Sequence, residues 1–190
     1  RGAYLPAAPY AMATQTEYQK AVRGVFSFCM CPGGFIVPSA TSQGEVVVNG
    51  MSPSKRDSKF ANSGMVVSVE NSDFEPYQKS GALAGMKFQA EVEKKACITA
   101  GNTQKAPAQR LVDYVSKQHS NTLPECSYQP GLESVNLEDV LPKEISERLK
   151  IGFRFFGKKM KGYLTNEAVL VGVESRTSSP VSIPRNRETM

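Results

Sequence analysis

Residues 22–40 read VRGVFSFCMCPGGFIVPSA and combine two runs of β-branched and aromatic residues with one sharp turn. Such side chains favour the pleated backbone, so we expect strands over residues 22–31 and 35–40. Pro32-Gly33-Gly34 lies between the two runs and predicts the turn that joins them. The folded part of the chain is therefore expected to open with a β-rich block.

The same kind of signal recurs on both sides of the middle of the chain. Residues 45–49 and 65–70 predict two more strands, with a polar loop over residues 50–64. Near the C-terminus, apolar residues predict a strand over residues 168–174 and a short one over 181–183. The β-rich segments therefore lie toward the two ends of the sequence.

Between these segments the spacing of apolar residues becomes helical. Residues 83–100 contain few helix breakers, Pro107 suits the first position of a second helix, and Pro142 opens a third. The expected buried faces are Leu83, Met86, Ala90 and Cys97 in the first helix, Ala108, Leu111, Val112 and Val115 in the second, and Ile145, Leu149, Phe153, Phe156 and Met160 in the third. Residues 122–141 are expected to form a loop.

Runs of strands, then helices, then strands indicate the α+β class rather than an alternating doubly wound sheet. We expect the last strands to pair with the first ones. The result would be a mixed or antiparallel sheet, or a partial barrel, with a three-helix subdomain inserted. The predicted parts are an extended arm over residues 1–20, a β part over 21–75 and 166–185, and a helical part over 80–162.

The composition excludes several classes of protein. The net charge of +5 comes from scattered Lys and Arg residues, so we expect no nucleic-acid binding. One histidine, His119, is too little for Ser-His-Asp hydrolysis or a multi-histidine metal site, and four cysteines are too few for a disulfide scaffold. No apolar run approaches the roughly 20 residues that cross a bilayer, so we expect a cytoplasmic location without membrane or metal. Because the first residue is Arg1, we expect a piece of a longer chain or a processed product.

The densest unusual segment is Phe28-Cys29-Met30-Cys31-Pro32-Gly33-Gly34. In a flavin-facing interpretation, its two glycines let the backbone approach a flat ligand while Cys29, Met30 and Cys31 pack sulfur groups against the ring. In the alternative interpretation, the segment is a strand with a tight turn and small buried thiols, and spacing alone favours this one. Residues i and i+2 of a strand share a face roughly 6.5–7 Å apart, which makes Cys29 and Cys31 a poor disulfide pair.

A polar loop between the expected strands carries Asn49, Met51, Arg56, Asp57 and Asn62. Its charged and amide groups can orient a carbonyl-rich ring or an acidic substrate through hydrogen bonds. The alternative is a solvated turn without a ligand. The residues alone do not separate these two interpretations.

A third segment reads Glu174-Ser175-Arg176-Thr177-Ser178-Ser179-Pro180. Small hydroxyl groups beside an arginine at the end of a strand can hold phosphate or pyrophosphate. The alternative is an Arg–Glu pair followed by a Ser-rich turn. The chain contains neither G-x-G-x-x-G nor G-x-x-x-x-G-K-[ST], so it has no nucleotide cradle of its own.

These segments together resemble a known family. FCMCPGG, VVVNGMS with the following RD and AN, and ESRTSSPV occur in that order, with GALAGMKFQAEVEKKA, APAQRLVDY and LPKEISERLKIGFRFFGKKMKGY between them. This ordered set is similar to the uncharacterised FAD-utilising (NAD(FAD)-dependent) dehydrogenases, a family of the flavoprotein superfamily with two dinucleotide-binding domains. The likeness covers nearly the whole chain. It implies that residues 21–190 form the inserted substrate domain and that the FAD-binding domain belongs to the rest of a parent chain.

The resemblance also implies an activity and a site. The parent chain would be an FAD-dependent oxidoreductase of a small-molecule substrate, with NAD(P)H as a candidate electron donor, and this chain alone would be catalytically incomplete. The segments nearest the flavin would be Cys29–Gly34 and Arg176–Pro180, and the weaker candidates for the substrate cleft are Asn49, Met51, Arg56, Asp57, Asn62 and Glu174. No catalytic base is implied. The alternatives are a free-standing β-rich module that binds a ligand or a protein, and a thiol enzyme that uses Cys29 or Cys31.

Overall fold

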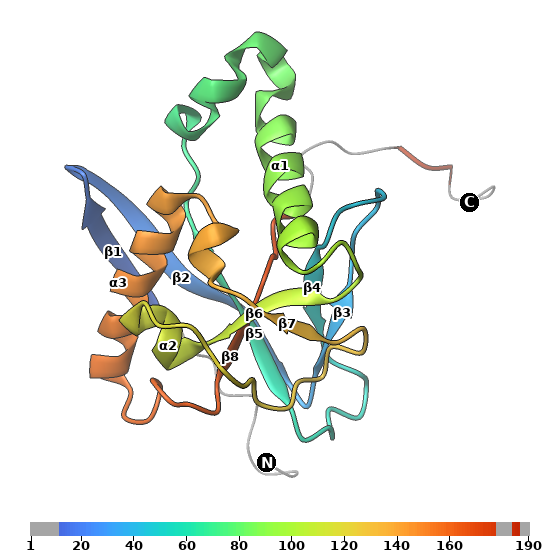
Figure 1. The fold of residues 1–190 in the computed structure, drawn as a ribbon, viewed down its shortest axis with the longest axis vertical. Coiled ribbons are helices and arrows are strands. Elements are labelled where there is room, and N and C mark those ends of the chain that lie inside the picture. Colours follow the sequence, from blue (N-terminus) through green and yellow to red (C-terminus); the bar gives the residue numbers. More distant parts are fainter. Residues whose placement is uncertain (1–11, 178–183, 187–190) are drawn as a thin grey trace.

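The computed structural model describes residues 12–177 and 184–186. The strands in these residues are β1 (Ala13–Tyr18), β2 (Ala21–Pro32), β3 (Phe35–Pro38), β4 (Val48–Met51), β5 (Ala61–Val67), β6 (Ala106–Arg110), β7 (Leu132–Ser134) and β8 (Val169–Val171). The helices are the 3₁₀ helices η2 (Asn71–Leu83) and η3 (Leu137–Asp139), and α1 (Ala84–Thr99), α2 (Leu111–Ser116) and α3 (Lys143–Lys159). Figure 1 shows their arrangement. The α+β class is confirmed, and no sheet within the described part of the chain closes into a barrel.

The long strand β2 organises the first sheet, which has the order β1-β2-β5. It pairs antiparallel with β1 along one edge and with β5 along the other. Between Phe28 and Cys31 the register with β5 shifts, because β2 carries an additional residue there. This bulge ends the simple alternation of side chains near the Pro-Gly-Gly turn.

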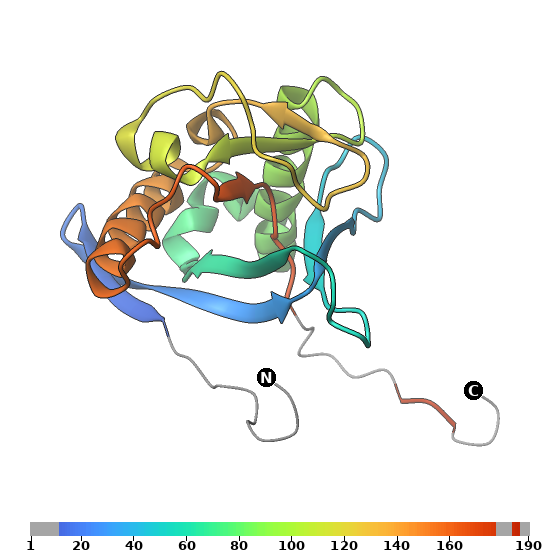
Figure 2. The ribbon, with the colours of Figure 1, turned by 90° about the horizontal axis from the view of Figure 1, so that it is seen from below.

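A second sheet has the order β7-β6-β8 and mixes parallel and antiparallel pairing around its central strand β6. Figure 2 shows this sheet on the opposite side of the molecule from β2 and β5, with α3 along one flank. A short pair of strands, β3 and β4, follows the Pro-Gly-Gly turn. The core between these layers includes Val25, Tyr114, Phe153 and Phe156, each no more than 1% exposed.

The expected extended arm over residues 1–20 is wrong for its described C-terminal part. Ala13–Tyr18 forms β1, which pairs with Ala21–Phe26 of β2. Gln19 and Lys20 join the two strands, and both have positive φ, as the tight hairpin turns that match strand twist require. The sequence did not indicate this hairpin turn, because neither Gln19 nor Lys20 is the Gly or Asn that such turns usually contain.

The prediction of a helix beginning at Pro107 is also wrong, because Pro107 lies in β6. The helix α2 begins only at Leu111 and is six residues long. A short strand followed by a short helix buries Ala108, Leu111 and Val115 together, and this mimics the spacing of one helical face. The predicted loop over residues 122–141 contains β7 and η3.

We expected the last strand to pair with the first strands of the chain, but the described residues show a different pairing. Strand β8 pairs with β6, which comes from the middle of the sequence. Contact with the N-terminal block is made just beyond β8, where Val48 donates its backbone N–H to the carbonyl of Val173 at 3.0 Å. The three α-helices do fall within residues 80–162, as expected, but β6 and β7 lie between them.

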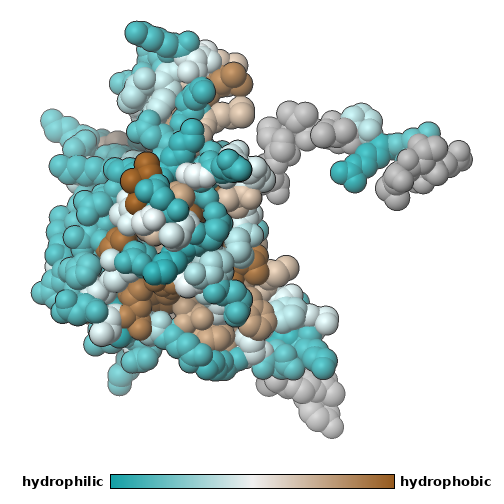
Figure 3. Space-filling model, turned by 45° about the vertical axis from the view of Figure 1, so that its right-hand side comes forward, coloured by the Kyte–Doolittle hydropathy of each residue, from teal (hydrophilic) through white to brown (hydrophobic). Residues whose placement is uncertain are grey.

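Helix α1 exists where it was predicted, but it buries a different face. Its buried residues are Glu93, Ala96 and Cys97, whereas Leu83 and Met86 are 53% and 66% exposed. The helix α3 follows the prediction closely, because Leu149, Phe153 and Phe156 are all buried. Figure 3, which brings the right-hand side of Figure 1 forward, shows several hydrophobic patches on the surface of the molecule.

Helix α3 is joined to the β1–β2 hairpin through Arg148, which is fully buried. Its guanidinium donates to the backbone carbonyls of Thr16 (2.7 Å), Tyr18 (3.1 Å) and Ala21 (3.1 Å) and pairs with Glu144 at 2.6 Å. The carbonyls at the hairpin end, of which that of Thr16 belongs to a buried residue, thus receive charged donors, which offsets the loss of their hydration.

The closest approach of α3 to the sheet is at Gly152. A Cβ there would lie 2.6 Å from Cγ1 of Val25, which is itself fully buried. Because Val25 has no free space to move into, we expect Gly152→Ala to destabilise the protein by about 1–2 kcal/mol, despite the better helix propensity of alanine. Gly85→Ala in α1 is the control, since its nearest neighbour would be 3.5 Å away, and it should be neutral or stabilising. Urea denaturation of both variants measures the difference, and equal effects would contradict this packing.

Candidate functional site

A cavity of about 1030 Å³ lies between the two main sheets and the helices α1 and α3. Its walls are mostly apolar, as is usual for small-molecule sites. The aromatic residues in the wall are Phe26, Phe28, Phe60, Phe74, Phe88, Tyr114, Phe153 and Tyr163. Phe26, Phe28 and Met30 are 39%, 43% and 48% exposed, so large apolar side chains of β2 remain incompletely covered. Such an uncovered apolar concavity is typical of a surface that a ligand or a neighbouring domain completes.

The glycines of the Pro-Gly-Gly turn serve contacts within the chain. A Cβ on Gly33, which has a φ of 59°, would lie 2.1 Å from the carbonyl of Arg56, and one on Gly34 would lie 2.6 Å from the carbonyl of Met51. Ser58 Oγ also donates to the Gly34 carbonyl at 3.3 Å. The turn therefore packs against the polar loop that follows β4. We predicted that these glycines would let a flat ligand approach the backbone closely. In the structure it is the backbone of this loop that approaches them.

The two thiols of the turn segment differ in environment because of the bulge in β2. Cys29 is exposed with a φ of 46°, whereas Cys31 is buried. Cys31 Sγ lies 3.6 Å from the position of a Cβ on Gly50, behind the cavity wall. Both cysteines are free, and no cluster of metal-ligating side chains occurs in residues 12–177 and 184–186. Of the segment Phe28–Gly34, Phe28 and Met30 line the cavity, and its two thiols and the Pro-Gly-Gly turn do not.

The polar loop contributes only part of its predicted residues to the cavity. Asn49 and Asn62 are in the wall. The amide Nδ2 of Asn62 is buried without a hydrogen-bond partner among the described residues. Met51, Arg56 and Asp57 are exposed and lie outside the wall. Their place in a substrate cleft therefore remains a prediction that this cavity does not support.

Arg176 is held by carboxylates in the C-terminal segment. Its guanidinium forms a bidentate pair with Glu93 of α1, at 3.1 Å from Nε and 2.7 Å from Nη2, and lies 3.5 Å from Glu45. Nη1 donates to Thr41 Oγ1 at 2.7 Å. All three nitrogens are engaged, which favours the Arg–Glu pair over a phosphate site. Thr177 lines the cavity, and Ser178, Ser179 and Pro180 lie outside the described residues.

Glu93 is the residue that sequence reasoning missed. It is 2% exposed and accepts hydrogen bonds from Ser175 at 2.6 Å and Gln89 at 2.7 Å, besides those from Arg176. Burial opposes its charge, but the donors of Arg176, Ser175 and Gln89 outweigh burial and lower the pKa of Glu93. The helical spacing could have indicated that Glu93 is buried, because it lies on the same face of α1 as Ala96, three residues later, and Cys97, four residues later.

Glu174 is the candidate whose carboxylate enters an apolar part of the cavity. A Cβ on Gly64 of β5 would lie 2.4 Å from its Oε2 and 3.2 Å from Cδ1 of Phe28. Burial raises the pKa of Glu174. Gly64 is therefore the residue that leaves room for a carboxylate over the sheet.

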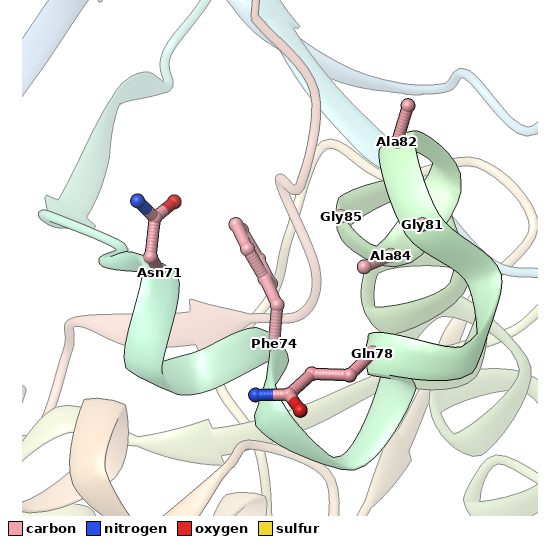
Figure 4. A pocket seen from close by; sticks show the side chains of 7 residues that line it. All are labelled: Asn71, Phe74, Gln78, Gly81, Ala82, Ala84 and Gly85. Atoms are coloured by element: carbon pink, nitrogen blue, oxygen red, sulfur yellow. The ribbon is translucent and has the colours of Figure 1, made fainter.

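A smaller hollow of about 510 Å³ lies between η2 and the start of α1. Figure 4 shows the Phe74 ring directed into it, with the polar side chains of Asn71 and Gln78 nearby. Phe74 also packs edge-on against Phe88 with ring centroids 5.5 Å apart. The lining includes neither a charged nor a nucleophilic side chain, whereas the wall of the large cavity holds several ionisable side chains and makes it the stronger candidate site.

The ion pair of Glu93 predicts a loss of stability with a defined pH dependence. Glu93→Gln removes the charge that compensates Arg176, so we expect about 1–3 kcal/mol of destabilisation at neutral pH. Because the pKa of Glu93 is lowered in the folded state, this stabilisation is complete above the unfolded value of about 4.3 and is lost as the pH falls below it. Urea denaturation at several pH values tests this, with Glu75→Gln, an exposed position, as the control. An effect of Glu93→Gln that stayed constant down to acidic pH would contradict it.

Comparison with known proteins places this fold in a family. A family model described as "FAD-dependent protein, C-terminal domain-like" matches residues 1–177. The chain is also 44% identical over 184 residues to an uncharacterized protein of Clostridium beijerinckii, an alignment that covers 96% of this chain and 34% of that protein. The chain thus spans about a third of this relative's length. No helix in the described ranges has the length and apolar character to cross a membrane. The chain belongs to the family of FAD-dependent protein C-terminal domain-like sequences.

Proposed function

We propose that this chain forms the wall of the substrate chamber in an FAD-dependent oxidoreductase and covers a flavin that another part of a longer protein binds. The observation that carries this proposal is the large apolar cavity, because segments far apart in the sequence contribute to its wall. Met30 comes from the turn segment, Asn49 and Asn62 from the polar loop, and Glu174 and Thr177 from the C-terminal segment. The membership in an FAD-dependent family supports the choice of cofactor.

The described residues fit one part of FAD better than the rest. Apolar side chains such as Phe28 and Met30 suit the flat isoalloxazine ring, and a sulfur atom packs well against an aromatic system. The pyrophosphate has no comparable partner here, since the guanidinium of Arg176 is already paired with Glu93. We therefore assign the phosphates and the adenosine to the FAD-binding domain of the parent chain. Residues 12–177 offer no nucleotide cradle, so NAD(P)H is not included in the proposal.

In this arrangement FAD supplies the redox chemistry, and the chain supplies shape and exclusion of water. The apolar walls keep water from the reacting groups, and a small-molecule substrate occupies the remaining volume. The Glu93–Arg176 pair keeps the C-terminal segment against α1, so that Glu174 and Thr177 stay in the wall. The alternative of a free-standing binding module receives less support, because the chain corresponds to about a third of its relative.

The proposal is tested on the full-length protein that contains this chain. We expect that protein to be yellow with bound FAD. Met30→Ala should make its flavin fluorescence easier to quench with iodide, because Met30 is removed from the wall that covers the ring. Met160→Ala is the matched control, since Met160 is similarly exposed, at 45%, but lies outside the cavity wall. A colourless full-length protein, or equal quenching in both variants, would argue for the binding-module alternative.

A further inference from the structure

Glu174 is held rigidly on both sides along the backbone. On its N-terminal side, the carbonyl of Val173 accepts the N–H of Val48 at 3.0 Å. On its C-terminal side, Ser175 and Arg176 both bind the buried Glu93. Because the backbone is held on both sides of Glu174, a ligand that binds its carboxylate need not order this part of the chain, which favours a specific contact.

The carboxylate of Glu174 has no polar partner among the residues that the structure describes. In residues 12–177 the structure records neither a hydrogen bond nor an ion pair to it, and the carboxylate lies over Gly64, beside which the ring of Phe28 also packs. A partly buried carboxylate usually has such partners, since losing hydration without compensation is costly. The raised pKa of Glu174 has this same cause. The missing donor is therefore a property of this site that a ligand can satisfy.

Other ionisable groups in the cavity wall do not compensate Glu174. Arg176 is neutralised by Glu93 and Glu45, and Glu125 is paired with Lys59 at 2.6 Å. The remaining ionisable side chains in the wall are Glu167, which is exposed, together with Cys126, Tyr114 and Tyr163. The hydroxyl of Tyr114 is engaged by Ser146 at 2.8 Å, and that of Tyr163 donates to Met65 Sδ at 3.7 Å. Glu174 thus provides an uncompensated acceptor in a mostly apolar chamber.

We propose that the cavity binds an apolar small molecule whose amino or hydroxyl group donates a hydrogen bond to Glu174, and that it rejects carboxylates. This inference rests on the proposed function, because it names the class of substrate that the same chamber accepts. The walls bind the hydrocarbon part, and Glu174 fixes the polar end. A carboxylate ligand would instead place two negative charges together in an apolar environment, which is strongly unfavourable.

The test uses the full-length protein and N-phenyl-1-naphthylamine, a neutral apolar probe that fluoresces in apolar cavities. Octylamine, 1-octanol and octanoate compete for the probe, and they share one hydrocarbon chain but differ in the polar group. At pH 8 we expect octylamine to displace the probe at a concentration at least about tenfold lower than octanoate, as a charge-assisted hydrogen bond predicts. 1-Octanol should fall between the two.

Glu174→Gln should abolish most of the difference between octylamine and octanoate. Glu167→Gln, in the exposed part of the same wall, should preserve it. In the wild type, the preference for octylamine should grow as the pH rises through the raised pKa of Glu174, because the carboxylate is then ionised. Equal competition by octylamine and octanoate in the wild type, failure of the probe to bind, or identical behaviour of the two variants would overturn the inference.

The stability of Glu174→Gln and the FAD content of the protein distinguish a failure of this inference from a failure of the proposed function. Because ionisation of Glu174 is disfavoured in the folded state, Glu174→Gln should fold and be at least as stable as the wild type at neutral pH. A less stable Glu174→Gln would show that the carboxylate has a structural partner, and this too would overturn the inference. The FAD content of the same preparations reports on the proposed function: yellow protein without head-group preference refutes the ligand class alone, whereas colourless protein refutes the flavin role.

Discussion

The ion pair between Glu93 and Arg176 is the constraint on which the cavity depends. It joins helix α1 to the segment after β8, and Glu45 and Thr41 connect it to the chain before β4. These segments are far apart in the sequence, so hydrophobic packing alone would allow them to slide. A bidentate pair in a buried position fixes their relative orientation, because a displaced guanidinium would leave a carboxylate buried without compensation. The wall that contains Glu174 keeps its place for this reason.

A second set of contacts keeps the opposite side of the molecule closed. Arg148 binds three carbonyls at the end of the β1–β2 hairpin, and Gly152 lets α3 pack directly on Val25. The helix therefore fills the space between the two main sheets on one flank. Toward the other flank the sheets remain apart, and the side chains there are too few to fill the volume. A chamber of about 1030 Å³ with mostly apolar walls results, and apolar concavities of this kind are typical of surfaces that a ligand or a neighbouring domain covers.

The structure also separates residues that position the chain from residues that line the cavity. Gly33 and Gly34 permit the turn to touch the loop around Met51 and Arg56, so their role is in chain packing. Met30, just before the turn, lines the cavity together with Phe26 and Phe28, at alternate positions of β2. The short segment from Met30 to Gly34 thus contains a residue of the cavity wall and two glycines that serve chain packing. Treating the segment as one motif would wrongly give all of them the same function.

The sequence by itself determined the α+β class, the strand and turn around residues 22–37, and the buried face of α3, because these depend on local propensity and on the spacing of large apolar side chains. It also brought forward Met30, Asn62 and Glu174, all of which line the cavity. Only the tertiary structure decided that Pro107 lies in a strand, that β8 pairs with β6, and that Arg56 and Asp57 stay outside the wall. It alone showed Arg176 paired with Glu93, since both the partner of a charge and the neighbour of a short strand are set by contacts between distant residues. Such contacts leave no periodic trace in a single sequence.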